Sequence, residues 1–549
     1  MNEVPEATLI SERLFALAER DGSRELIIDP VFGRVSYGTA AEQVERLAWA
    51  LRAHDLGRGD IVILQLPNWA PFLIFHMALS AIGAVTVTIP IVYRERELAG
   101  VVGLTGAKAL VVPAGFHGFD YAAMAVTLKD GHAGLAHVFL VGAGDESPNT
   151  ADTISYQDLM REPWEARGGQ QSLAELRPAL DDVAALGFTS GTTGSLKGAI
   201  YDTNIIHATN MGFIDRYGLN EGDRIFGCSP IGHAVGFTHA LRMTLTIGGS
   251  IVLLERWQPD QALELIQREG CTFMACATPF LLDLVYHPAL ANSGRLSSVR
   301  LFLCGGASVP EQLMRDARAA LPHTFTSPLW GMTECGGVTT CPFDAPEDKL
   351  FETDGLPCAS MELKIVDDDG NEVARGEDGE LRARGPMVTK GYFAQSELTE
   401  EYYLDDGFFR TGDQARMDED GYIKITGRIK DLIIRGGVNI SPVDIESVLF
   451  AHPKITNVAV IGMPDPRLGE RICAYVIAAA GETLALPEIQ QWMADAEVAK
   501  PKWPERIEFV DDLPMTPSGK VQKFRLREMI AERIAAERPA DSAAGGSGG

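Results

Sequence analysis

A short segment of the chain combines hydroxyl side chains, glycines and one lysine in a way that suits phosphate binding. Residues 186–198 read Leu-Gly-Phe-Thr-Ser-Gly-Thr-Thr-Gly-Ser-Leu-Lys-Gly, so an apolar stretch runs into a loop of small residues. The residues that could contact phosphate are Thr189, Ser190, Gly191, Thr192, Thr193, Gly194, Ser195 and Lys197. Glycine lets the backbone approach a ligand closely, hydroxyls donate hydrogen bonds, and the lysine adds a cation. We interpret the segment as a phosphate-binding loop, with a plain Gly/Thr turn as the alternative.

The spacing excludes a Walker loop, and the net charge excludes polyanions as the main ligand. A Walker loop places its lysine between a glycine and a Ser or Thr, whereas Lys197 follows Leu196 and precedes Gly198. Lys and Arg total 48 against 75 Asp and Glu, a net charge of -27. Such a chain repels nucleic acid and acidic membranes. A nucleotide remains compatible, because its phosphates need only local donors.

Four further strings carry side chains that suit a nucleotide or a reacting acid. They are Gly305-Gly306-Ala307, Trp330-Gly331-Met332-Thr333-Glu334, Thr411-Gly412-Asp413 with Gly427-Arg428, and Pro-Met-Thr-Pro-Ser-Gly-Lys at 514–520. Taken singly, a Thr-Glu pair can cap a helix, a Thr-Gly-Asp string can form a turn, and Lys520 can be a solvated surface lysine. Together with the phosphate loop, and in this order, the strings resemble the adenylate-forming superfamily over residues 10–535. That superfamily includes acyl-CoA synthetases, carrier-protein adenylation domains and firefly luciferase.

The resemblance implies an ATP site built from these strings. The phosphate loop would hold the β and γ phosphates, Thr333 would bond the α-phosphate, and Glu334 would bind Mg²⁺, which prefers oxygen ligands. Asp413 would accept hydrogen bonds from both ribose hydroxyls, and Arg428 would donate to ribose or phosphate. The residues expected around adenine are Gly305, Gly306, Ala307, Trp330, Gly331 and Met332.

The resemblance also implies a catalytic lysine on a moving domain. Lys520 would neutralise charge on the acyl carboxylate and the α-phosphate in the transition state. Lys430 matches the hinge, and rotation there would withdraw Lys520 and bring the loop with Gly436 and Gly437 toward the site for transfer to CoA. Acetylation of Lys520 by a lysine acetyltransferase would remove its charge and stop adenylation. The catalytic residues implied are Lys520, Thr333, Glu334 and His233.

The specificity for the carboxylic acid is expected to depend on residues near 229–237 and on the stretch 273–279. The expected pocket residues are His233, Ala234, Phe237, Cys276 and Thr278. Amino-acid-activating relatives carry an aspartate, and dihydroxybenzoate-activating relatives an asparagine, at the position that Ala234 matches. Alanine offers no partner to an ammonium or a ring hydroxyl, so both substrate classes are disfavoured. His233 matches an aromatic position that borders the acid carboxylate and gates the phosphate side, with a core histidine as the alternative.

Three strings narrow the resemblance to a branch of the superfamily. Leu66-Pro-Asn-Trp69, Tyr93-Arg-Glu-Arg-Glu-Leu98 and the segment 516–527 look like cyclohexanecarboxylate-CoA ligases and medium-chain acyl-CoA synthetases. We therefore expect an alicyclic, aryl or short- to medium-chain aliphatic acid, activated with ATP and transferred to CoA. A free-standing ligase that loads a carrier protein is the alternative. A luciferase-like oxygenase and a catalytically dead sensor are disfavoured, the sensor because Lys520, Glu334 and Lys197 are all present.

The elements that must position these residues alternate between helix and strand as far as residue 340. Apolar Val44, Leu47 and Leu51 after the string Thr39-x-x-Glu42 indicate a helix that begins with a capping box. A strand is expected over 61–66, a helix over 69–82 and a strand over 84–89. The uncharged stretch 68–93 is thus interpreted as core rather than as a membrane span. The alternation predicts a layered α/β fold with mostly parallel sheets.

The length of 549 residues predicts more than one domain. We expect a large N-terminal adenylation domain over 1–429 that binds ATP and the acid. Within it, residues 350–429 change to short strands divided by Asp/Gly turns, as in antiparallel hairpins or a small barrel. Residues 430–535 read as a small mobile α+β domain that carries Lys520, and 536–549 as a disordered Gly/Ser tail without a role.

The remaining features of the sequence concern the cell compartment. The eight cysteines show no metal-ligand spacing and mostly lie in apolar strings, so we expect reduced core residues. The N-terminus lacks a basic region followed by an apolar stretch, which argues against a signal peptide. We expect a cytoplasmic enzyme without a membrane span, and a homodimer is left open.

Overall fold

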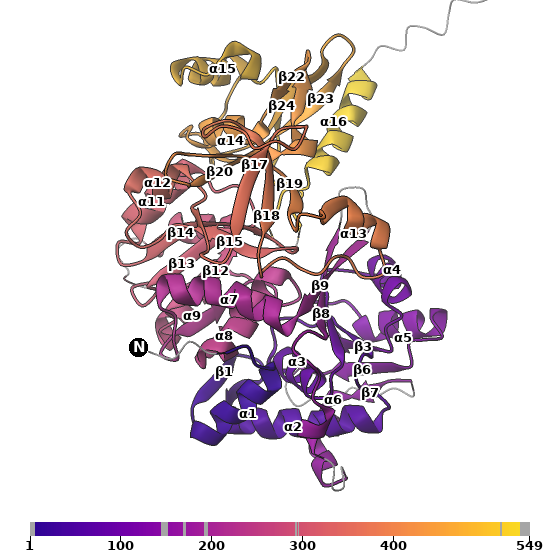
Figure 1. The fold of residues 1–549 in the computed structure, drawn as a ribbon. Helices are drawn as coiled ribbons and strands as arrows, with labels where there is room; N and C mark the ends of the chain where they lie inside the picture. Colours follow the sequence, from indigo (N-terminus) through magenta and orange to yellow (C-terminus); the bar gives the residue numbers. More distant parts are fainter. Residues whose placement is uncertain are drawn as a thin grey trace, which may run out of the picture.

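The computed structural model of the chain describes residues 6–143, 152–167, 172–190, 196–290, 294, 296–516 and 519–537 (Figure 1). They form four β-sheets of nine, seven, four and five strands, covered by helices. In Figure 1 the two large sheets occupy the lower part of the molecule, and the smaller orange and yellow elements lie above them. The layered α/β fold expected from the sequence is confirmed.

The seven-stranded sheet has the order β7-β6-β5-β3-β4-β8-β9, and only the pair β8 and β9 is antiparallel. Its strands are β3 Ile61–Leu64, β4 Val85–Thr88, β5 Ala109–Pro113, β6 His137–Val141, β7 Ile154–Ser155, β8 Val183–Ser190 and β9 Leu196–Asp202. The helices of this part are α2 Tyr37–Ala53, α3 Ala70–Ala81, α4 Glu95–Thr105, α5 Tyr121–Gly131 and α6 Tyr156–Arg161, with 3-10 turns η1 Trp164–Arg167 and η2 Leu173–Leu176. The expected strands over 61–66 and 84–89 and the helix over 69–82 are confirmed.

Helix α3 is apolar on every side because it is surrounded by other elements. All of its residues are buried except the half-buried Ser80, and it contacts α1, α2, β1 and β4. A helix without a face toward water has no need of a polar stripe. The uncharged stretch 68–93 is therefore a core helix followed by strand β4, as expected.

Helix α2 corrects the expected capping box. The N-cap is Ser36, whose Oγ accepts a hydrogen bond of 3.1 Å from the Thr39 amide, so Thr39 lies inside the first turn. Ser36 is also the last residue of strand β2, so the chain has already turned from strand to helix when it reaches Thr39. Ser36 and Thr39 both carry a hydroxyl. The sequence pattern predicted Thr39 as the N-cap, whereas the structure has Ser36 at that position.

The nine-stranded sheet has the order β16-β15-β14-β13-β12-β10-β11-β1-β2. Its strands are β1 Glu25–Asp29, β2 Gly33–Ser36, β10 Arg224–Gly227, β11 Ser250–Leu253, β12 Phe273–Ala277, β13 Leu301–Gly305, β14 Phe325–Met332, β15 Gly336–Thr340 and β16 Leu356–Pro357. The helices are α1 Ile10–Asp21, α7 Thr203–Tyr217, the π-helix η3 Val235–Arg242, α8 Met243–Ile247, α9 Pro259–Glu269, α10 Thr278–Val285, α11 Glu311–Ala320 and α12 Glu347–Glu352. Strands β1 and β10 to β14 are parallel, so their carboxyl ends meet at one edge.

The third sheet is an antiparallel meander, β17 Glu362–Val366, β18 Gly379–Arg384, β19 Phe409–Met417 and β20 Ile423–Arg428, with α13 Ser396–Tyr402. Its outer strands β17 and β20, all of whose residues are described, do not pair, so this sheet is open and the barrel alternative is not adopted. Strand β16 pairs with β15, so the first residues of the expected 350–429 unit belong to the nine-stranded sheet.

The last sheet contains β21 Ile433–Arg435, β22 Val438–Ile440, β23 Ile455–Asp465, β24 Gly469–Ala478 and β25 Arg506–Phe509, covered by α14 Pro442–Phe450, α15 Leu486–Asp495 and α16 Lys523–Glu537, with the 3-10 turn η5 Lys500–Lys502. A 3-10 turn, η4 Ile429–Asp431, connects β20 to β21 and contains Lys430. Helix α16 continues to Glu537, and 538–549 lie outside the described residues.

Two composition-based expectations concern burial. All eight cysteines are buried free thiols, as expected of core residues. None of the helices found in the described residues is both long and apolar enough to cross a membrane.

Candidate active site

Three of the expected strings follow neighbouring strands of the nine-stranded sheet. Strand β12 leads into Thr278, β13 ends at Gly305, and β14 contains Trp330. Thr278 Oγ1 donates to the carbonyls of Ala307 (3.3 Å) and Ser308 (3.2 Å) and so braces the loop after β13. Ligands of α/β sheets bind outside the carboxyl ends of the strands. The expected adenine-side residues therefore share one edge suited to a ligand.

Glycines allow close backbone contacts along this edge. A Cβ on Gly305 would lie 2.0 Å from the Leu329 carbonyl oxygen, and one on Gly331 would lie 2.1 Å from that of Gly336. Gly306 differs, because it has φ +81° and its nearest neighbour would be Lys520 Cε at 3.8 Å. Gly305 and Gly331 are therefore required by packing, because a side chain there would collide with a backbone carbonyl. Gly306 instead leaves free space beside Lys520.

Lys520 belongs to the C-terminal domain, which contains the five-stranded sheet, and reaches the carboxyl edge of the nine-stranded sheet from there. The preceding Gly519 has φ +80°, and a Cβ there would lie 3.2 Å from Pro279 Cγ and 3.4 Å from Ala277 Cβ. The Lys520 amide donates to Thr516 Oγ1 (3.0 Å), and the Thr516 amide donates to the Lys520 carbonyl (2.7 Å). This turn holds Lys520 between the two parts of the chain.

Asp413 is fixed by two partners from different strands. Trp330 Nε1 donates to Asp413 Oδ2 (2.9 Å), and Arg428 Nε lies 3.1 Å from Oδ1, across the β19–β20 register. The carboxylate is buried and the arginine remains partly exposed. Trp330, expected against adenine, thus uses its ring N–H to orient the residue expected to bind ribose.

The basic side chains near the Asp413 carboxylate lower one another's pKa values. Burial, and then the charge of Arg428, lower the pKa of Lys520 to about 8, although Asp413 and Glu334 oppose the shift. Burial, and then the Lys520 charge, lower the pKa of His233 to about 4. At neutral pH Lys520 is therefore mostly charged and His233 is neutral. The two side chains are close enough to interact electrostatically, and the role of His233 beside the reacting groups stays a prediction.

Lys430 contributes to the same positive region from η4. Desolvation, followed by the charge of Arg428, lowers its pKa to about 8, and Lys197 adds to this effect. The side chain nevertheless remains open to solvent. The expected hinge residue thus lies within electrostatic range of the phosphate-loop lysine.

Glu334 is a buried carboxylate held by neutral groups. Tyr392 Oη donates to its Oε1 at 2.9 Å, and its own carbonyl accepts hydrogen bonds from the Thr389 amide (2.8 Å) and Oγ1 (3.1 Å). The carbonyl of Thr333 accepts a hydrogen bond from Tyr201 Oη. No described lysine, arginine or histidine pairs with the Glu334 carboxylate, which leaves it able to bind a cation.

Two tyrosines surround the phosphate-loop lysine. Lys197 Nζ lies 4.0 Å from the ring centre of Tyr402 and 5.2 Å from that of Tyr392. Cations are attracted to the faces of aromatic rings. Tyr392 therefore contacts Lys197 through its ring and Glu334 through its hydroxyl. We call Tyr392 and Tyr402 the tyrosine bracket.

The phosphate loop itself lies largely outside the described residues. Thr189 and Lys197 pair across the hairpin of β8 and β9. Of Ser190 only the backbone is described, as the last residue of β8, and Gly191, Thr192, Thr193, Gly194 and Ser195 are not described. The segment after residue 390 joins this hairpin, because the Phe393 amide donates to the Gly198 carbonyl (2.8 Å).

The expected acid-binding string opens a π-helix. His233 and Ala234 directly precede η3, and the Phe237 amide donates to the His233 carbonyl (2.9 Å). Phe237 is buried with its ring 4.8 Å from that of His76. π-helical turns are rare and often lie at functional sites. The irregular helix thus begins where the acid is expected to bind.

Cys276, an expected pocket residue, faces away from this helix. Side chains alternate along β12, so Ala275 shares the core of Phe237, whereas Cys276 packs with Cys228 and Cys304 on the other face of the sheet. The expectation for Cys276 is therefore corrected, and Ala275 takes its place beside η3.

The tyrosine bracket was missed as a functional feature. The pair Tyr402-Tyr403 lies shortly before the string Thr411-Gly412-Asp413, and nothing in its composition connects it to Lys197. Tyr392 follows Gly391 in a segment without a recognised string. The signal for it in the sequence is the density of tyrosines between 392 and 403.

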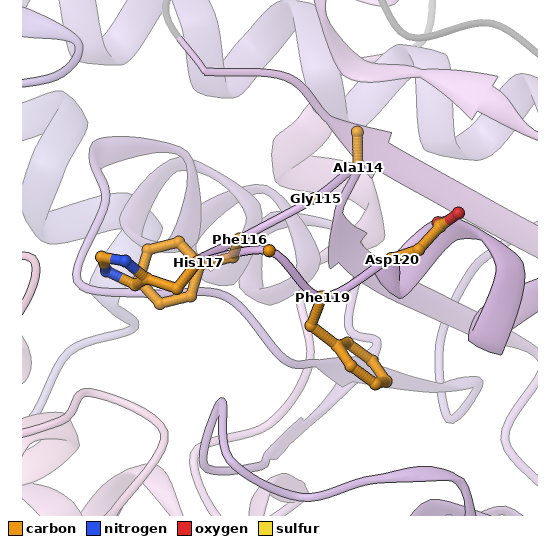
Figure 2. A pocket seen from close by; sticks show the side chains of 7 residues that line it. Ala114, Gly115, Phe116, His117, Phe119 and Asp120 are labelled. Atoms are coloured by element: carbon orange, nitrogen blue, oxygen red, sulfur yellow. The ribbon is translucent and has the colours of Figure 1, made fainter.

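A hollow of about 520 Å³ lies elsewhere, on the loop 114–120 after β5 (Figure 2). The rings of Phe116 and His117 lie side by side there, with centroids 4.2 Å apart, and His117 Nε2 is 3.9 Å from Glu255 Oε1. One loop lines this open hollow, and none of the expected site residues belongs to it. The candidate site is the sheet edge instead.

The fold and the site are those of a two-domain enzyme that binds a nucleotide at the carboxyl edge of a sheet. The profile of the AMP-binding enzyme family matches residues 14–393, and that of the AMP-binding enzyme C-terminal domain matches 444–520. The chain belongs to the AMP-binding enzyme family, and the resemblance stated from the sequence is confirmed.

Relatives of known name share most of their length with this chain. A medium-chain fatty-acid–CoA ligase of Escherichia coli (strain K12) is 35% identical over 92% of this chain and 88% of its own length. A 2,3-dihydroxybenzoate-AMP ligase of Bacillus subtilis (strain 168) is 32% identical over 91% and 90%. The crystal structure of ATP-bound MatB from Rhodopseudomonas palustris superposes with a TM-score of 0.84, at 29% identity over 95% of this chain and 99% of that one.

Proposed function

We propose that the protein is an ATP-dependent acid–CoA ligase, which activates a carboxylic acid as acyl-AMP, releases pyrophosphate and transfers the acyl group to CoA. The position of Lys520 carries the proposal. Its side chain lies beside Gly306 and within electrostatic range of Asp413 and Glu334, where the carboxylate and the α-phosphate would meet. ATP-dependent acyl-AMP formation is common to the acyl-CoA ligases and aryl-AMP ligases among the relatives.

In the first half-reaction, a carboxylate oxygen of the acid attacks the α-phosphorus of ATP. The bond from that phosphorus to the bridging oxygen breaks, and pyrophosphate leaves with the electron pair. Negative charge grows on the α-phosphoryl oxygens, and the ammonium of Lys520 and the hydroxyl of Thr333 would stabilise it. Thr189 and Lys197 would hold the departing phosphates. Asp413, oriented by Trp330, would hold the ribose.

Glu334 fits a magnesium ligand. Glu334 is 5% exposed, and among the described residues Tyr392 is the one hydrogen-bond donor to its carboxylate. Among the described residues, no group of three or more His, Cys, Asp or Glu could hold a metal ion, which agrees with a Mg²⁺ ion bound mainly by phosphate oxygens and water. Bound there, Mg²⁺ would neutralise charge on the phosphates of ATP.

In the second half-reaction, the CoA thiolate attacks the acyl carbon, and AMP leaves. We propose that the domain after η4 rotates at Lys430 and presents the β21–β22 turn, in which Gly436 (φ 60°) and Gly437 (φ 85°) allow the pantetheine arm to pass near the backbone. The same hairpin exposes Ile434 (55%) and Val438 (58%). An apolar hairpin surface fits one that contacts the N-terminal domain after rotation.

The acid is proposed to be alicyclic, aryl or short- to medium-chain aliphatic. Ala234, Phe237 and Ala275 supply apolar surface and no charge beside η3. The E. coli relative acts, by its name, on medium-chain fatty acids. Transfer to a carrier protein is the second candidate, because a salicyl-AMP ligase of Mycobacterium tuberculosis, also named a salicyl-S-ArCP synthetase, is 33% identical over 90% of this chain.

The test is acid-dependent pyrophosphate release from magnesium-ATP across aliphatic, alicyclic, aryl and amino acids, with and without CoA. Release that CoA accelerates, with acyl-CoA formed, supports the ligase. Release that ignores CoA favours the carrier-protein candidate, and no release with any acid contradicts both. Acetylation of Lys520 should abolish the acid-dependent signal, and an acetylated enzyme that still releases pyrophosphate contradicts its role.

A further inference from the structure

Ser441 lies on the C-terminal side of the hinge and makes a hydrogen bond to the other side. Its Oγ donates to the carbonyl of Thr426, a residue of β20 in the N-terminal domain. The same oxygen accepts a hydrogen bond of 3.3 Å from the Asp444 amide and so caps helix α14. Ser441 is 8% exposed and Thr426 3%, so water competes little for the bond between them. One hydroxyl thus serves a helix of its own domain and a strand of the other.

Apolar side chains make up much of the remaining boundary around α14. This helix contacts β20 and α11 of the N-terminal domain. Leu449 of α14 belongs to the same buried apolar cluster as Leu313 of α11. Apolar contacts have no preferred direction, whereas a hydrogen bond needs its donor and acceptor aligned. The bond from Ser441 to Thr426 therefore specifies how the two domains are oriented, and the apolar surfaces mainly hold them together.

Arg527 connects the C-terminal side of the hinge to the helix that follows Lys520. Its Nη1 lies 3.1 Å from Asp431 Oδ1, and its Nη2 donates to the Asp431 carbonyl at 3.4 Å. Arg527 belongs to α16, which begins shortly after Lys520. Asp431 is therefore fixed to the C-terminal domain, and a rotation at Lys430 carries Ser441 and Lys520 together. The same movement that withdraws Lys520 separates Ser441 from β20.

We propose, building on the rotation at Lys430 in the proposed function, that Ser441 is a positioning residue that favours the arrangement with Lys520 at the sheet edge. In that arrangement its hydroxyl makes both hydrogen bonds, and after rotation it keeps the helix cap and loses the bond to Thr426. One buried hydrogen bond between neutral groups changes the ratio of the two arrangements about fivefold. Because Lys520 serves acyl-AMP formation and is withdrawn for thioester formation, Ser441 favours the first half-reaction over the second.

Substitutions of Ser441 test this role through the two half-reactions. At pH 7 Ser441→Asp keeps an acceptor for the Asp444 amide but has no proton to donate, so it separates the cross-domain bond from the helix cap. The ratio of kcat/KM for ATP in pyrophosphate exchange to kcat/KM for CoA in the consumption of acyl-AMP should fall about fivefold. Ser441→Thr, which keeps a hydroxyl, should keep the ratio. An equal change in both constants indicates a merely structural role and overturns the proposal.

The matched control is Tyr475→Phe. The Tyr475 hydroxyl donates to the Leu526 carbonyl (3.2 Å), so this variant also loses a hydroxyl-to-carbonyl bond, but one inside the C-terminal domain. Its ratio should equal that of the unmodified protein, and a fall as large as in Ser441→Asp refutes the assignment to the domain boundary. Ser441→Ala, which lacks both bonds, should repeat the shift and takes the place of Ser441→Asp if that variant does not fold.

A distance measurement tests the same bond without catalysis. Ala319→Cys on α11 and Ala496→Cys after α15 lie at exposed positions and can carry spin labels, because the eight native cysteines are buried. In the full chain without ATP, Ser441→Asp should increase the fraction of molecules at the rotated distance relative to Ser441→Thr. Identical distance distributions refute the proposal. If no acid supports pyrophosphate exchange, the ligase function fails, and this measurement still decides the role of Ser441.

Discussion

The lowered pKa of Lys520 predicts an alkaline loss of adenylation. With a pKa of about 8, Lys520 is about 90% protonated at pH 7 and about 10% protonated at pH 9. Only the ammonium can neutralise charge in the transition state, so kcat/KM for ATP should fall about tenfold over this range. A lysine with its ordinary pKa of 10.5 would stay charged to pH 9, and the rate would hardly change.

The assay is ATP–pyrophosphate exchange at saturating acid, without CoA, so that the thiol of CoA does not titrate in the same window. Lys520→Arg should leave a residual rate that is flat from pH 7 to 9, because a guanidinium stays charged there. Lys430 also has a pKa of about 8, and Lys430→Ala is therefore the control that should keep the fall. A fall that persists in Lys520→Arg and vanishes in Lys430→Ala would refute the assignment to Lys520.

Three further substitutions test contacts around the site. Tyr392→Phe removes the hydroxyl 2.9 Å from the proposed magnesium ligand, so the Mg²⁺ concentration for half-maximal activity should rise several-fold, and an unchanged requirement contradicts that role. Tyr402→Leu removes the ring 4.0 Å from Lys197 Nζ, and loss of about 1 kcal/mol should raise KM for ATP about fivefold, whereas Tyr402→Phe should leave it unchanged. Gly305→Ala places a Cβ 2.0 Å from a carbonyl oxygen of β14 and should lower the free energy of unfolding, measured by denaturant titration, by about 1–3 kcal/mol. Gly103→Ala is the control, because a Cβ at Gly103 meets no atom within 4 Å. Equal stabilities of the two variants would contradict the packing argument.

Contiguous strings made much of the candidate site predictable. Gly305-Gly306-Ala307 and the string around Glu334 each combine residues within a few positions, so the resemblance to a known superfamily could assign them expected roles without a fold. The βα alternation likewise predicted α3 and β4, because a helix and a strand differ in length and in the period of their apolar residues. Their approach to Lys520 needed the structure.

Features that depend on which way a side chain points were not predictable. The tyrosine bracket joins Lys197 to Tyr392 and Tyr402, which lie about two hundred positions later in the sequence, and no local pattern predicts that contact. Cys276 was assigned to the wrong face because β12 is apolar on both sides, so its sequence does not alternate. Hydrophobic patterning predicts burial, and it cannot say which of two cores a residue enters.

The burial of all eight cysteines makes the native chain unreactive toward thiol-directed dyes as long as it stays folded. Cysteines introduced on the surface would therefore be the only ready labelling sites. A pair with one member at the exposed Val438 and the other on the N-terminal domain could carry a donor and an acceptor fluorophore. Energy transfer between them would follow the distance between the domains through each turnover, one molecule at a time.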